Sequence, residues 1–463
     1  MLYLLAKVEL ERIAGYQGIF IEHDDLVIEN FVEDISGEDI RSVGAELVLG
    51  KIYQKIGFPE QGSCKLFKPL VLSRLVYPGS KLKMVDYFKK HLNLSISVYS
   101  IYRFMDELSG GLKDQLEDIA FAHTCRMLEG NVGVVFYDIT TLYFEASEED
   151  DFRIAGFSKD GKHQHPQILV GLLVSSQGYP IGYQIFEGNT SETKTLVPAL
   201  KAFQHRFKLQ KPVIVADAAL LSQNNIDTLV EQGYLYILGG RLKNESKRLK
   251  TQILDLKIEA NEPVELLHPN GRLIITYSEK RAGKDRRNRE KGLKRLEKRV
   301  KSGKLTKEHI NNRGYNKYLT LTGEANVHID YNKFAADSAW DGLKGFVTNT
   351  TIPKLKVVEN YSHLWQIEKA FRISKTDLRI RPVYHRIKGR ILAHISICFA
   401  AYAVFKELER QLTENKIGIS PQKAIEEIKQ IQQLTYQLPK CGDVKTQLLK
   451  PNQIQQQLLN MNI

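Results

Sequence analysis

Two short apolar runs, each followed directly by an aspartate, limit the possible folds of this chain more than any other feature. The first, GNVGVVFY, leads to Asp138, and the second, KPVIVA, leads to Asp217. Both are rich in valine, isoleucine or aromatic residues, which favours buried strands. In open α/β sheets, side chains beyond the strand ends converge on a crevice where ligands bind. We therefore expect the two aspartates at the ends of adjacent central strands, as candidate ligands of a divalent cation.

The segments around these strands complete a mixed α/β pattern. PQILVGLLVSSQGYPIGYQIFEGN divides into two strand-like runs joined by a turn with Gly178 and Pro180, which is typical of an antiparallel hairpin. KTLVPALKAFQHRF and SQNNIDTLVEQG have helical patterns, and the second closes at Gly233. YLYILGG and DGLKGFVTNT are further predicted strands.

Changes in pattern divide the chain into five expected regions. A helical region comes first, and the α/β core follows in two parts separated by a basic insertion with short strand-like pieces. A second helical region ends the chain. The expected boundaries are 1–128 for the helical N-terminal region, 129–240 for the first part of the core, 241–336 for the β-rich insertion, 337–410 for the second part of the core and 411–463 for the helical C-terminal region.

The charge balance favours a polyanionic partner. The chain has 66 Lys and Arg against 54 Asp and Glu, a net charge of +12, and its pI is near 9.2. Basic soluble proteins are common, so charge alone does not establish nucleic-acid binding. Between Lys280 and Lys304, thirteen basic residues face three acidic ones. Leu293, Leu296 and Val300 recur there at helical spacing, which leaves two interpretations: a solvated surface helix or a helix that contacts a DNA backbone.

The N-terminal region contains a candidate DNA reader. SKLKMVDYFKKHLNLSISVYSIYRFMDEL has the pattern of short helices separated by a turn. A helical domain with a solvated basic face explains the same pattern equally well. On the first interpretation, five basic residues supply phosphate contacts: Lys81, Lys83, Lys89, Lys90 and Arg103.

Cysteine usage and hydropathy point to the cytoplasm. The four cysteines, Cys64, Cys125, Cys398 and Cys441, show neither the spacing of a zinc site nor a disulfide framework. The longest apolar run, ISICFAAYAVF, is shorter than a membrane span, and MLYLLAKVELER lacks a basic leader. We therefore expect a soluble intracellular protein with reduced thiols and no membrane partner.

A third carboxylate lies in YSHLWQIEKAFRISK, residues 361 to 375. On one continuous helix starting at Asn360, a polar line of Tyr361, Glu368, Arg372 and Lys375 would lie beside an apolar stripe of Leu364, Ile367, Phe371 and Leu378. Glu368 would then face the two aspartates, and the basic residues would neutralise phosphate oxygens. A plainer alternative is an ion pair between Glu368 and Arg372 across one helical turn.

The spacing of Tyr361, position 364, Glu368 and Lys375 resembles the Tyr-Arg-Glu-Lys signature of bacterial insertion-sequence DDE transposases. Leu364 replaces the signature arginine, so either Arg372 takes over its phosphate contact or an apolar residue suffices there. Further similarity lies in YDITTLYFE, FSKDGKHQHPQILVGLLVSSQGYPIGYQIFEGNTSET, VIVADAALLS and RPVYHRIKGRILAHISICFAAY, which together cover about residues 130 to 405.

This resemblance implies an RNase H-like mixed five-stranded sheet, split by a β-rich insertion and flanked by helical N- and C-terminal regions. Asp138, Asp217 and Glu368 would be the catalytic residues and would bind two Mg²⁺ ions, for which Mn²⁺ is a plausible substitute. One ion would activate water or a 3′ hydroxyl, and the other would stabilise the leaving oxygen. Tyr361, Arg372 and Lys375 would contact DNA.

The partners implied are the double-stranded DNA of transposon ends and of a target, bound by a homodimer in a synaptic complex. The enzyme would bind terminal inverted repeats, cleave the ends and join them to target DNA, in the cytoplasm of a bacterium and on the nucleoid when bound to DNA. Two alternatives remain open on the sequence: a catalytically inactive, transposase-derived DNA-binding regulator, and a metal-dependent nuclease that cuts DNA without joining it.

Overall fold

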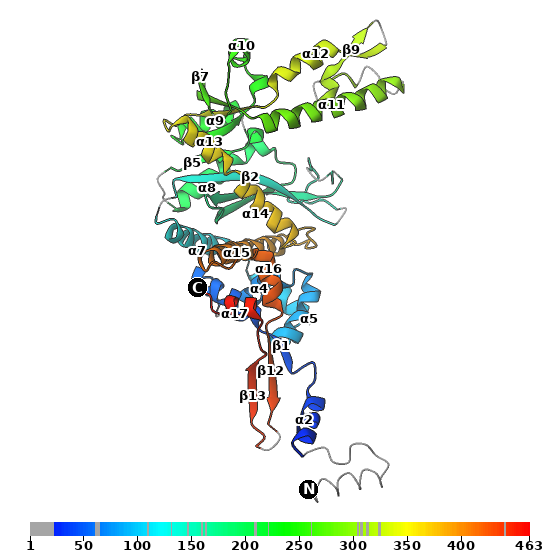
Figure 1. Ribbon diagram of the computed structural model, residues 1–463, viewed down its shortest axis with the longest axis vertical. Coiled ribbons are helices and arrows are strands. Elements are labelled where there is room, and N and C mark those ends of the chain that lie inside the picture. The colour runs from blue at the N-terminus through cyan, green and yellow to red at the C-terminus, as the bar shows by residue number, and fades with distance from the viewer. Residues whose placement is uncertain are drawn as a thin grey trace, which may run out of the picture. The chain divides into compact units, whose positions relative to one another are not determined.

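The structure is a computed structural model (Figure 1). It describes residues 23–463 except 61–64, 109–110, 131, 146–147, 159–160, 163, 208–210, 221, 261, 303–304, 306–308, 312–313, 323–325 and 439–440. The N-terminal segment to residue 22, and Cys64, therefore lie outside the described residues. The chain divides into two units: a helical unit of residues up to Ile119, Ile373–Ile380 and His385–Ile463, and a sheet unit of Ala120–Arg372 and Arg381–Tyr384.

An eight-stranded sheet forms the centre of the sheet unit, in the order β4-β3-β2-β5-β6-β11-β8-β7. Its strands are β2 Val134–Tyr143, β3 Gln167–Ser175, β4 Pro180–Glu187, β5 Val213–Ala216, β6 Tyr236–Gly240, β7 Val264–His268, β8 Gly271–Tyr277 and β11 Leu343–Thr348. Valine, isoleucine and aromatic residues dominate β2, β3 and β5, and nearly all of them are buried.

The first five of these strands confirm the predicted RNase H-like core. β2, β5 and β6 run parallel to one another. β3 pairs antiparallel with β2 and with β4, which is the predicted hairpin. The sheet is wider than predicted, because β11 joins the edge of β6 and the pair β7–β8 continues the sheet in antiparallel fashion. Two strands of the region 241–336 are thus part of the central sheet.

One face of the sheet is covered by helices that bury an apolar core. Every second residue of the central strands points into this core, including Tyr137 on β2, Ala216 on β5, Leu238 on β6 and Val347 on β11. The covering helices are α7 Leu112–Met127, α8 Leu196–Phe207, α9 Gln223–Glu231 and α10 Lys247–Asp255. The alternate residues of the same strands, among them Asp138, point to the opposite face.

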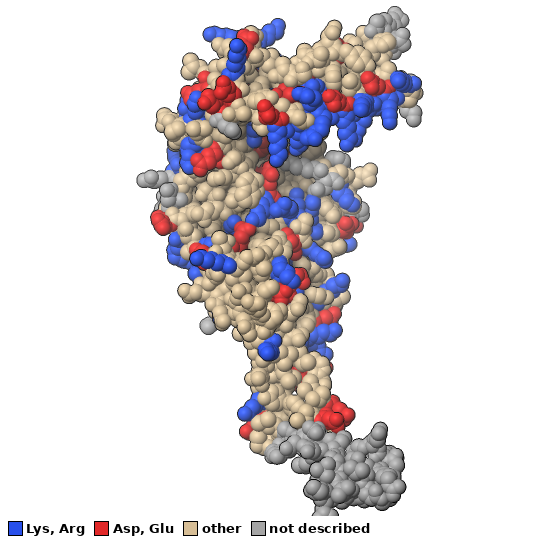
Figure 2. Space-filling view, in the orientation of Figure 1, with Lys and Arg blue, Asp and Glu red and all other residues tan. Residues whose placement is uncertain are grey.

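The rest of the region 241–336 is dominated by a single long helix. This is α11 Glu279–Lys301, which carries most of the basic block and packs against a small hairpin and a short helix. Leu296 of α11 is buried with Tyr318, Leu319 and Val327. The hairpin strands are β9 Leu319–Thr322 and β10 Asn326–Ile329, and the short helix is α12 Tyr331–Ala336. Figure 2 shows the lysine and arginine side chains gathered along α11.

The helical unit is built around one long buried helix. Its elements are α2 His23–Asp34, β1 Ile40–Ser42, the π-helix Ala45–Gly50, α3 Lys51–Ile56, α4 Phe67–Val76, α5 Lys81–Leu92, α6 Val98–Glu107, α15 Lys388–Glu414, α16 Pro421–Lys429, β12 Gln432–Gln437, β13 Val444–Leu448 and α17 Gln453–Leu459. The central helix α15 packs against α3, α4, α6 and α16. By length and composition α15 could cross a membrane, but 89% of its most apolar window is buried inside the protein.

The C-terminal region was expected to be helical, and the structure corrects this in part. QIQQL, predicted as the end of a helix, lies mostly in β12, which pairs with β13 and with β1 in a three-stranded antiparallel sheet. The helix α16 ends at Lys429. The remaining helices of this region, α16 and α17, were within the expected pattern.

Candidate active site

The sequence suggested that Asp138 lies at the end of a strand. In the structure it lies in the middle of β2. The strand runs from Val134 to Tyr143, and Asp138 pairs with Leu172 of β3. The prediction ended the strand at the first charged residue. The strand continues because the following residues, Ile139 to Tyr143, are again β-branched, leucine or aromatic.

Asp217 lies where the sequence predicted it, directly after β5. In the parallel pairing of β2 with β5, Tyr137 is opposite Ala216. Asp138 and Asp217 are the next residues on these two neighbouring segments. Because Tyr137 and Ala216 both point into the helix-covered core, the two aspartates point to the opposite face. There Asp217 is exposed, and its Oδ1 accepts a 2.6 Å hydrogen bond from the Ala218 amide.

The segment that carries Glu368 is two helices, which corrects the single helix assumed from the sequence. α13 Lys354–Ser362 carries Tyr361, and α14 Trp365–Thr376 carries Glu368, Arg372 and Lys375. Between them the amides of Leu364 and Gln366 bond to carbonyls only three residues back, which tightens the turn. Only Glu368, Arg372 and Lys375 therefore form a line along one helix.

The predicted apolar stripe of this segment is buried. Leu364 is 7% exposed and Ile367 is fully buried, as Phe371 and Leu378 nearly are. Leu364 is thus a core residue at the junction of α13 and α14. An apolar side chain at this position is therefore consistent with its place in the protein interior.

Tyr361 connects α13 to the second aspartate. Its hydroxyl donates a 3.3 Å hydrogen bond to Asp217 Oδ1, and its ring packs against Phe346 of β11, with centroids 4.7 Å apart. Gly239 of β6 provides the space, because a Cβ there would lie 2.5 Å from the Tyr361 hydroxyl. Burial, and then the charge of Asp217, raise the pKa of Tyr361 above its ordinary value of 10.0, so the hydroxyl stays protonated as a donor.

Lys344 of β11 is a charged residue of this face that the sequence analysis did not single out. Its Nζ lies 4.4 Å from the centre of the Tyr361 ring. Burial, and then the charge of Arg281, lower the pKa of Lys344, while the charges of Asp217 and Glu368 act in the opposite direction. A detectable signal was the alternation in DGLKGFVTNT, which places Lys344 on the same face of β11 as Phe346.

Glu368 is exposed in the first turn of α14. Its charge acts on both Tyr361 and Lys344, as does the charge of Asp217. The two carboxylates therefore share two neighbours. Arg372 is exposed and Lys375 is half-buried, four and seven residues further along the helix.

The carboxylates fit a divalent cation by their chemistry, since hard oxygen ligands are those that Mg²⁺ prefers. The structure relates Asp138 to Asp217 by strand register, and Asp217 to Glu368 by their shared neighbours. Within the described residues, no three or more His, Cys, Asp or Glu side chains form a group arranged to hold a metal ion. The assignment of Asp138, Asp217 and Glu368 as metal ligands thus stays a prediction.

A basic pocket adjoins this face. It has a volume of about 280 Å³, and its lining includes four basic residues and the ring of Trp340. Two of the four, Lys344 and Arg281, are the residues whose charges act at Tyr361. Lys243 is paired with Asp337 at 2.6 Å, and the fourth basic residue is Arg241. This excess of positive charge suits the phosphates of a nucleic acid.

Of the five basic residues considered as phosphate contacts of the N-terminal region, one is not on the surface. Lys81 is 4% exposed, so it is not part of a solvated basic face. The other four are exposed on or beside α5 and α6: Lys83, Lys89, Lys90 and Arg103.

Comparisons with known proteins address the family. No curated protein matches the sequence of this chain. Among solved structures, a piggyBac transposase synaptic complex with hairpin DNA is similar with a TM-score of 0.43 and 9% identity, over 87% of this chain and 78% of that one. The Mos1 strand transfer complex has a TM-score of 0.17 and 11% identity, over 39% and 59% of the two chains. These structural similarities are too weak to support a conclusion about the fold, which is established here by the strand order alone.

The family comparison is decisive. The family described as "Transposase DDE domain" matches residues 133–404, which is more than half of the chain and spans β2 to α15. All three predicted carboxylates, Asp138, Asp217 and Glu368, lie inside the matched range. The chain therefore belongs to the DDE transposase family.

Proposed function

We propose that this protein is an active transposase that binds the terminal inverted repeats of an insertion sequence, cleaves the DNA at its ends and transfers the new 3′ ends to target DNA. The observation that carries the proposal is the position of Asp138 and Asp217 on the face of the sheet opposite the helix-covered core, at neighbouring points of two parallel strands. Glu368 is connected to Asp217 through Tyr361 and Lys344, because the charges of Asp217 and Glu368 both act on the pKa values of these two residues.

In this proposal Asp138, Asp217 and Glu368 hold two divalent ions, Mg²⁺ by preference and Mn²⁺ as a substitute. Bound there, the ions would lower the pKa of a water or a 3′ hydroxyl and offset the charge of the phosphate oxygens. Tyr361 orients Asp217 through its hydrogen bond. Lys344 and Arg281 contribute positive charge next to the phosphodiester.

DNA contacts are assigned to three places. Tyr361, Arg372 and Lys375, on α13 and α14, would contact the DNA beside the scissile phosphate. The exposed basic residues of α11 and of the N-terminal helices would bind other parts of the DNA backbone. We further propose that two copies pair in a synaptic complex, because two transposon ends must be brought together, and that the enzyme works in the bacterial cytoplasm.

The decisive experiment replaces each acid by its isosteric amide: Asp138→Asn, Asp217→Asn and Glu368→Gln. The purified chain is incubated with end-bearing duplex, a target plasmid and Mg²⁺. Wild type should give joined products, and each variant should lose cleavage by a factor of at least about 10³ while retaining end binding within about threefold, because catalysis of phosphoryl transfer depends on charge stabilisation. Glu359→Gln, an exposed acid on α13, is the matched control and should retain activity.

The same assay separates the alternatives. Strand transfer by all three variants would contradict the assignment of the acids. Cleavage by wild type without joined products would identify a nuclease, and end binding without either product would identify an inactive regulator.

A further inference from the structure

The helical unit buries a group of titratable side chains that the proposed chemistry does not use. This basic cluster consists of Arg74 on α4, Lys81 in the first turn of α5, His385, and His394 and Cys398 on α15. Arg74 and Lys81 are each 4% exposed, and His394 is 5% exposed. Two basic side chains, Arg74 and Lys81, are thus buried in the same region.

The hydrogen bonds of the cluster leave donors without partners. Arg74 Nη2 lies 3.2 Å from His394 Nδ1, and His394 Nε2 lies 3.0 Å from the Ile380 carbonyl oxygen. His394 therefore donates through Nε2, accepts from Arg74 through Nδ1 and is neutral. The Arg74 Nε–H is buried with no partner among the described residues. The Lys81 ammonium has only the Met84 sulfur, at 3.8 Å.

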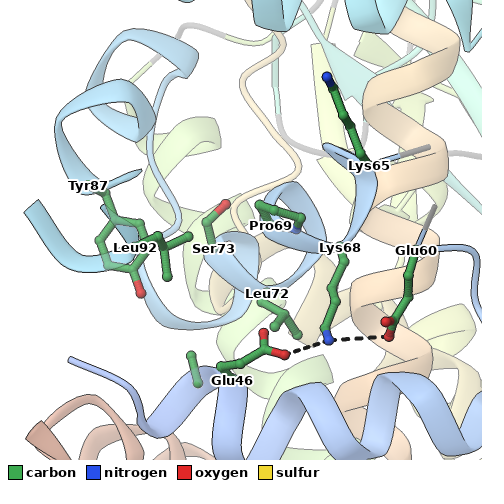
Figure 3. Close-up of a pocket in the computed structure, with 10 residues that line it drawn as sticks. Glu46, Glu60, Lys65, Lys68, Pro69, Leu72, Ser73, Tyr87 and Leu92 are labelled. Atoms are coloured by element: carbon green, nitrogen blue, oxygen red, sulfur yellow. Dashed lines mark hydrogen bonds and ion pairs between the residues drawn. The ribbon is translucent and has the colours of Figure 1, made fainter. Parts of the chain in front are cut away.

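Lys68, a half-buried lysine of the same unit, has the carboxylate partners that Lys81 and Arg74 lack within the described part of the chain. Lys68 lines a pocket of about 190 Å³, where its Nζ lies 2.6 Å from Glu46 Oε1 and 3.2 Å from Glu60 Oε1 (Figure 3). Although burial opposes it, these two carboxylates raise the pKa of Lys68. Lys81 and Arg74 have no carboxylate partner among the described residues.

The electrostatics of the cluster favour an anion. Burial, and then the charge of Arg74, lower the pKa of Lys81 to about 7. Burial, and then the charges of Lys81 and Arg74, lower the pKa of His385 to about 3. Asp106 is the acid whose charge acts on the pKa of His385. Its carboxylate is already bound by Arg390 through two 2.8 Å hydrogen bonds. A metal cation at His394 and Cys398 would meet two positive charges, whereas an anion would be attracted by both.

We propose that Arg74 and Lys81 form a binding site for a phosphate group, with the half-buried His385 at its outer edge. An oxyanion would accept from the free Arg74 Nε–H and from the Lys81 ammonium, which are charge-assisted bonds. It would also remove the cost of burying cations without a counterion. The phosphate comes either from free inorganic phosphate or from a DNA backbone, and the inference does not depend on the cleavage chemistry.

The first test measures inorganic phosphate binding to the full chain at pH 6, by calorimetry and by the melting temperature, against chloride at equal ionic strength. Wild type should bind phosphate and melt at a higher temperature in its presence. Lys81→Met, which keeps the length of the side chain, should bind at least about tenfold more weakly and lose the increase. Lys83→Met, on the exposed face of the same helix, is the matched control and should behave as wild type.

A second measurement uses wild type alone and so does not depend on the folding of a variant. Sulfate keeps its charge between pH 6 and 9, so its affinity should fall as pH rises through about 7, where Lys81 loses its proton. A pH-independent sulfate affinity, equal phosphate binding by wild type and Lys81→Met, or no binding by wild type would each overturn the proposal.

Duplex DNA separates the two sources of phosphate. If a DNA phosphate occupies the site, Lys81→Met lowers duplex affinity and reduces the slope of log affinity against log salt concentration by about one unit. Inorganic phosphate then also competes with the duplex. If free phosphate occupies it, Lys81→Met binds duplex as wild type does while the melting increase is lost. Both results support an oxyanion site.

Discussion

Lys344 of β11 lies within the electrostatic influence of Asp217 and Glu368, two of the predicted metal ligands. Its ammonium is attracted by Asp217 and Glu368 and lies against the Tyr361 ring. In the chain without a metal ion, Lys344 therefore offsets part of the negative charge of the carboxylates. A divalent ion held by these carboxylates would bind against this neighbouring positive charge.

This predicts that Lys344→Met binds Mn²⁺ more tightly than wild type in the absence of DNA, by about tenfold, because a repulsive unit charge is removed close to the ion. Titration followed by electron paramagnetic resonance measures the change. Lys356→Met, an exposed lysine paired with Glu359 on α13, should leave Mn²⁺ affinity unchanged. Equal or weaker Mn²⁺ binding by Lys344→Met would show that Lys344 does not act on the carboxylates.

Gly239 is required by the close approach of Tyr361. A Cβ at this position would lie 2.5 Å from the Tyr361 hydroxyl and 2.9 Å from the Ala218 amide nitrogen. Gly239→Ala should lower the free energy of unfolding by about 1 to 3 kcal/mol, because the added methyl overpacks the site. Urea unfolding of the single and double variants provides the measurement.

The double variant Gly239→Ala, Tyr361→Phe should recover part of the loss, since it removes the atom that the new methyl meets first. Strictly additive effects of the two substitutions would mean that the hydroxyl and the methyl do not meet.

At the scale of elements, α11 is attached to the sheet by a buried ion pair. Arg289 on α11 bonds to Asp341, two residues before β11, and their side chains are 10% and 14% exposed. The pair fixes the basic helix next to the strand that carries Lys344.

Arg289→Met should therefore destabilise the chain by about 3 to 5 kcal/mol, because Asp341 is left charged, poorly solvated and unpaired. Chemical denaturation measures this loss, and Lys291→Met on the exposed side of α11 is the control. A loss below about 1 kcal/mol would place the Asp341 carboxylate in contact with water.

Element boundaries were the least predictable part of this fold. The segment from Asn360 has a continuous helical pattern, and the break at Leu364 is set by tertiary packing: Tyr361 is held by Gly239 and Phe346, while Leu364 is buried. β12 is rich in glutamine, which has little preference for strands, so its pairing with β1 and β13 left no local signal. β2, β3, β5 and β6 were predictable because their apolar runs are short and bounded by turns.

For the candidate site, the sequence suggested residues, which stay a prediction, but not their geometry. Asp138 and Asp217 were suggested by the apolar runs before them, Glu368 and its basic neighbours by helical spacing, and the resemblance to a family grouped the three acids as one site. Lys344 and Arg281 did not, because they come from β11 and α11, and only folding brings their charges to Asp217. The burial of Lys81 was equally hidden, since lysine at the start of a helix is usually solvated.

At the scale of the whole molecule, the buried Lys81 should influence stability as a function of pH. The folded pKa of about 7 is below the ordinary value of 10.5. Between these values the unfolded chain holds a proton at Lys81 that the folded chain does not, so this residue makes the free energy of unfolding rise with pH. Below about pH 7 Lys81 is protonated in both the folded and the unfolded chain, and the folded chain bears the full free-energy cost of burying its charge. The groups facing Lys81 are Arg74 of α4, His385, and His394 and Cys398 of α15.

Relative to Lys81→Met, wild type should therefore gain stability from pH 7 to pH 9.5 without phosphate, by up to about 1.4 kcal/mol per pH unit. Urea unfolding at several pH values measures the difference, which cancels the titration of all other groups. If the free energies of unfolding of wild type and Lys81→Met changed with pH in parallel, Lys81 would have the same pKa in the folded and the unfolded chain.

The strand that holds Asp138 continues for five residues beyond it and stays paired with β3 to its end. Asp217, by contrast, follows the last residue of its strand, and Glu368 is in the first turn of its helix. Asp138 is therefore held by strand pairing before and after it, whereas Asp217 and Glu368 each lie at one end of an element.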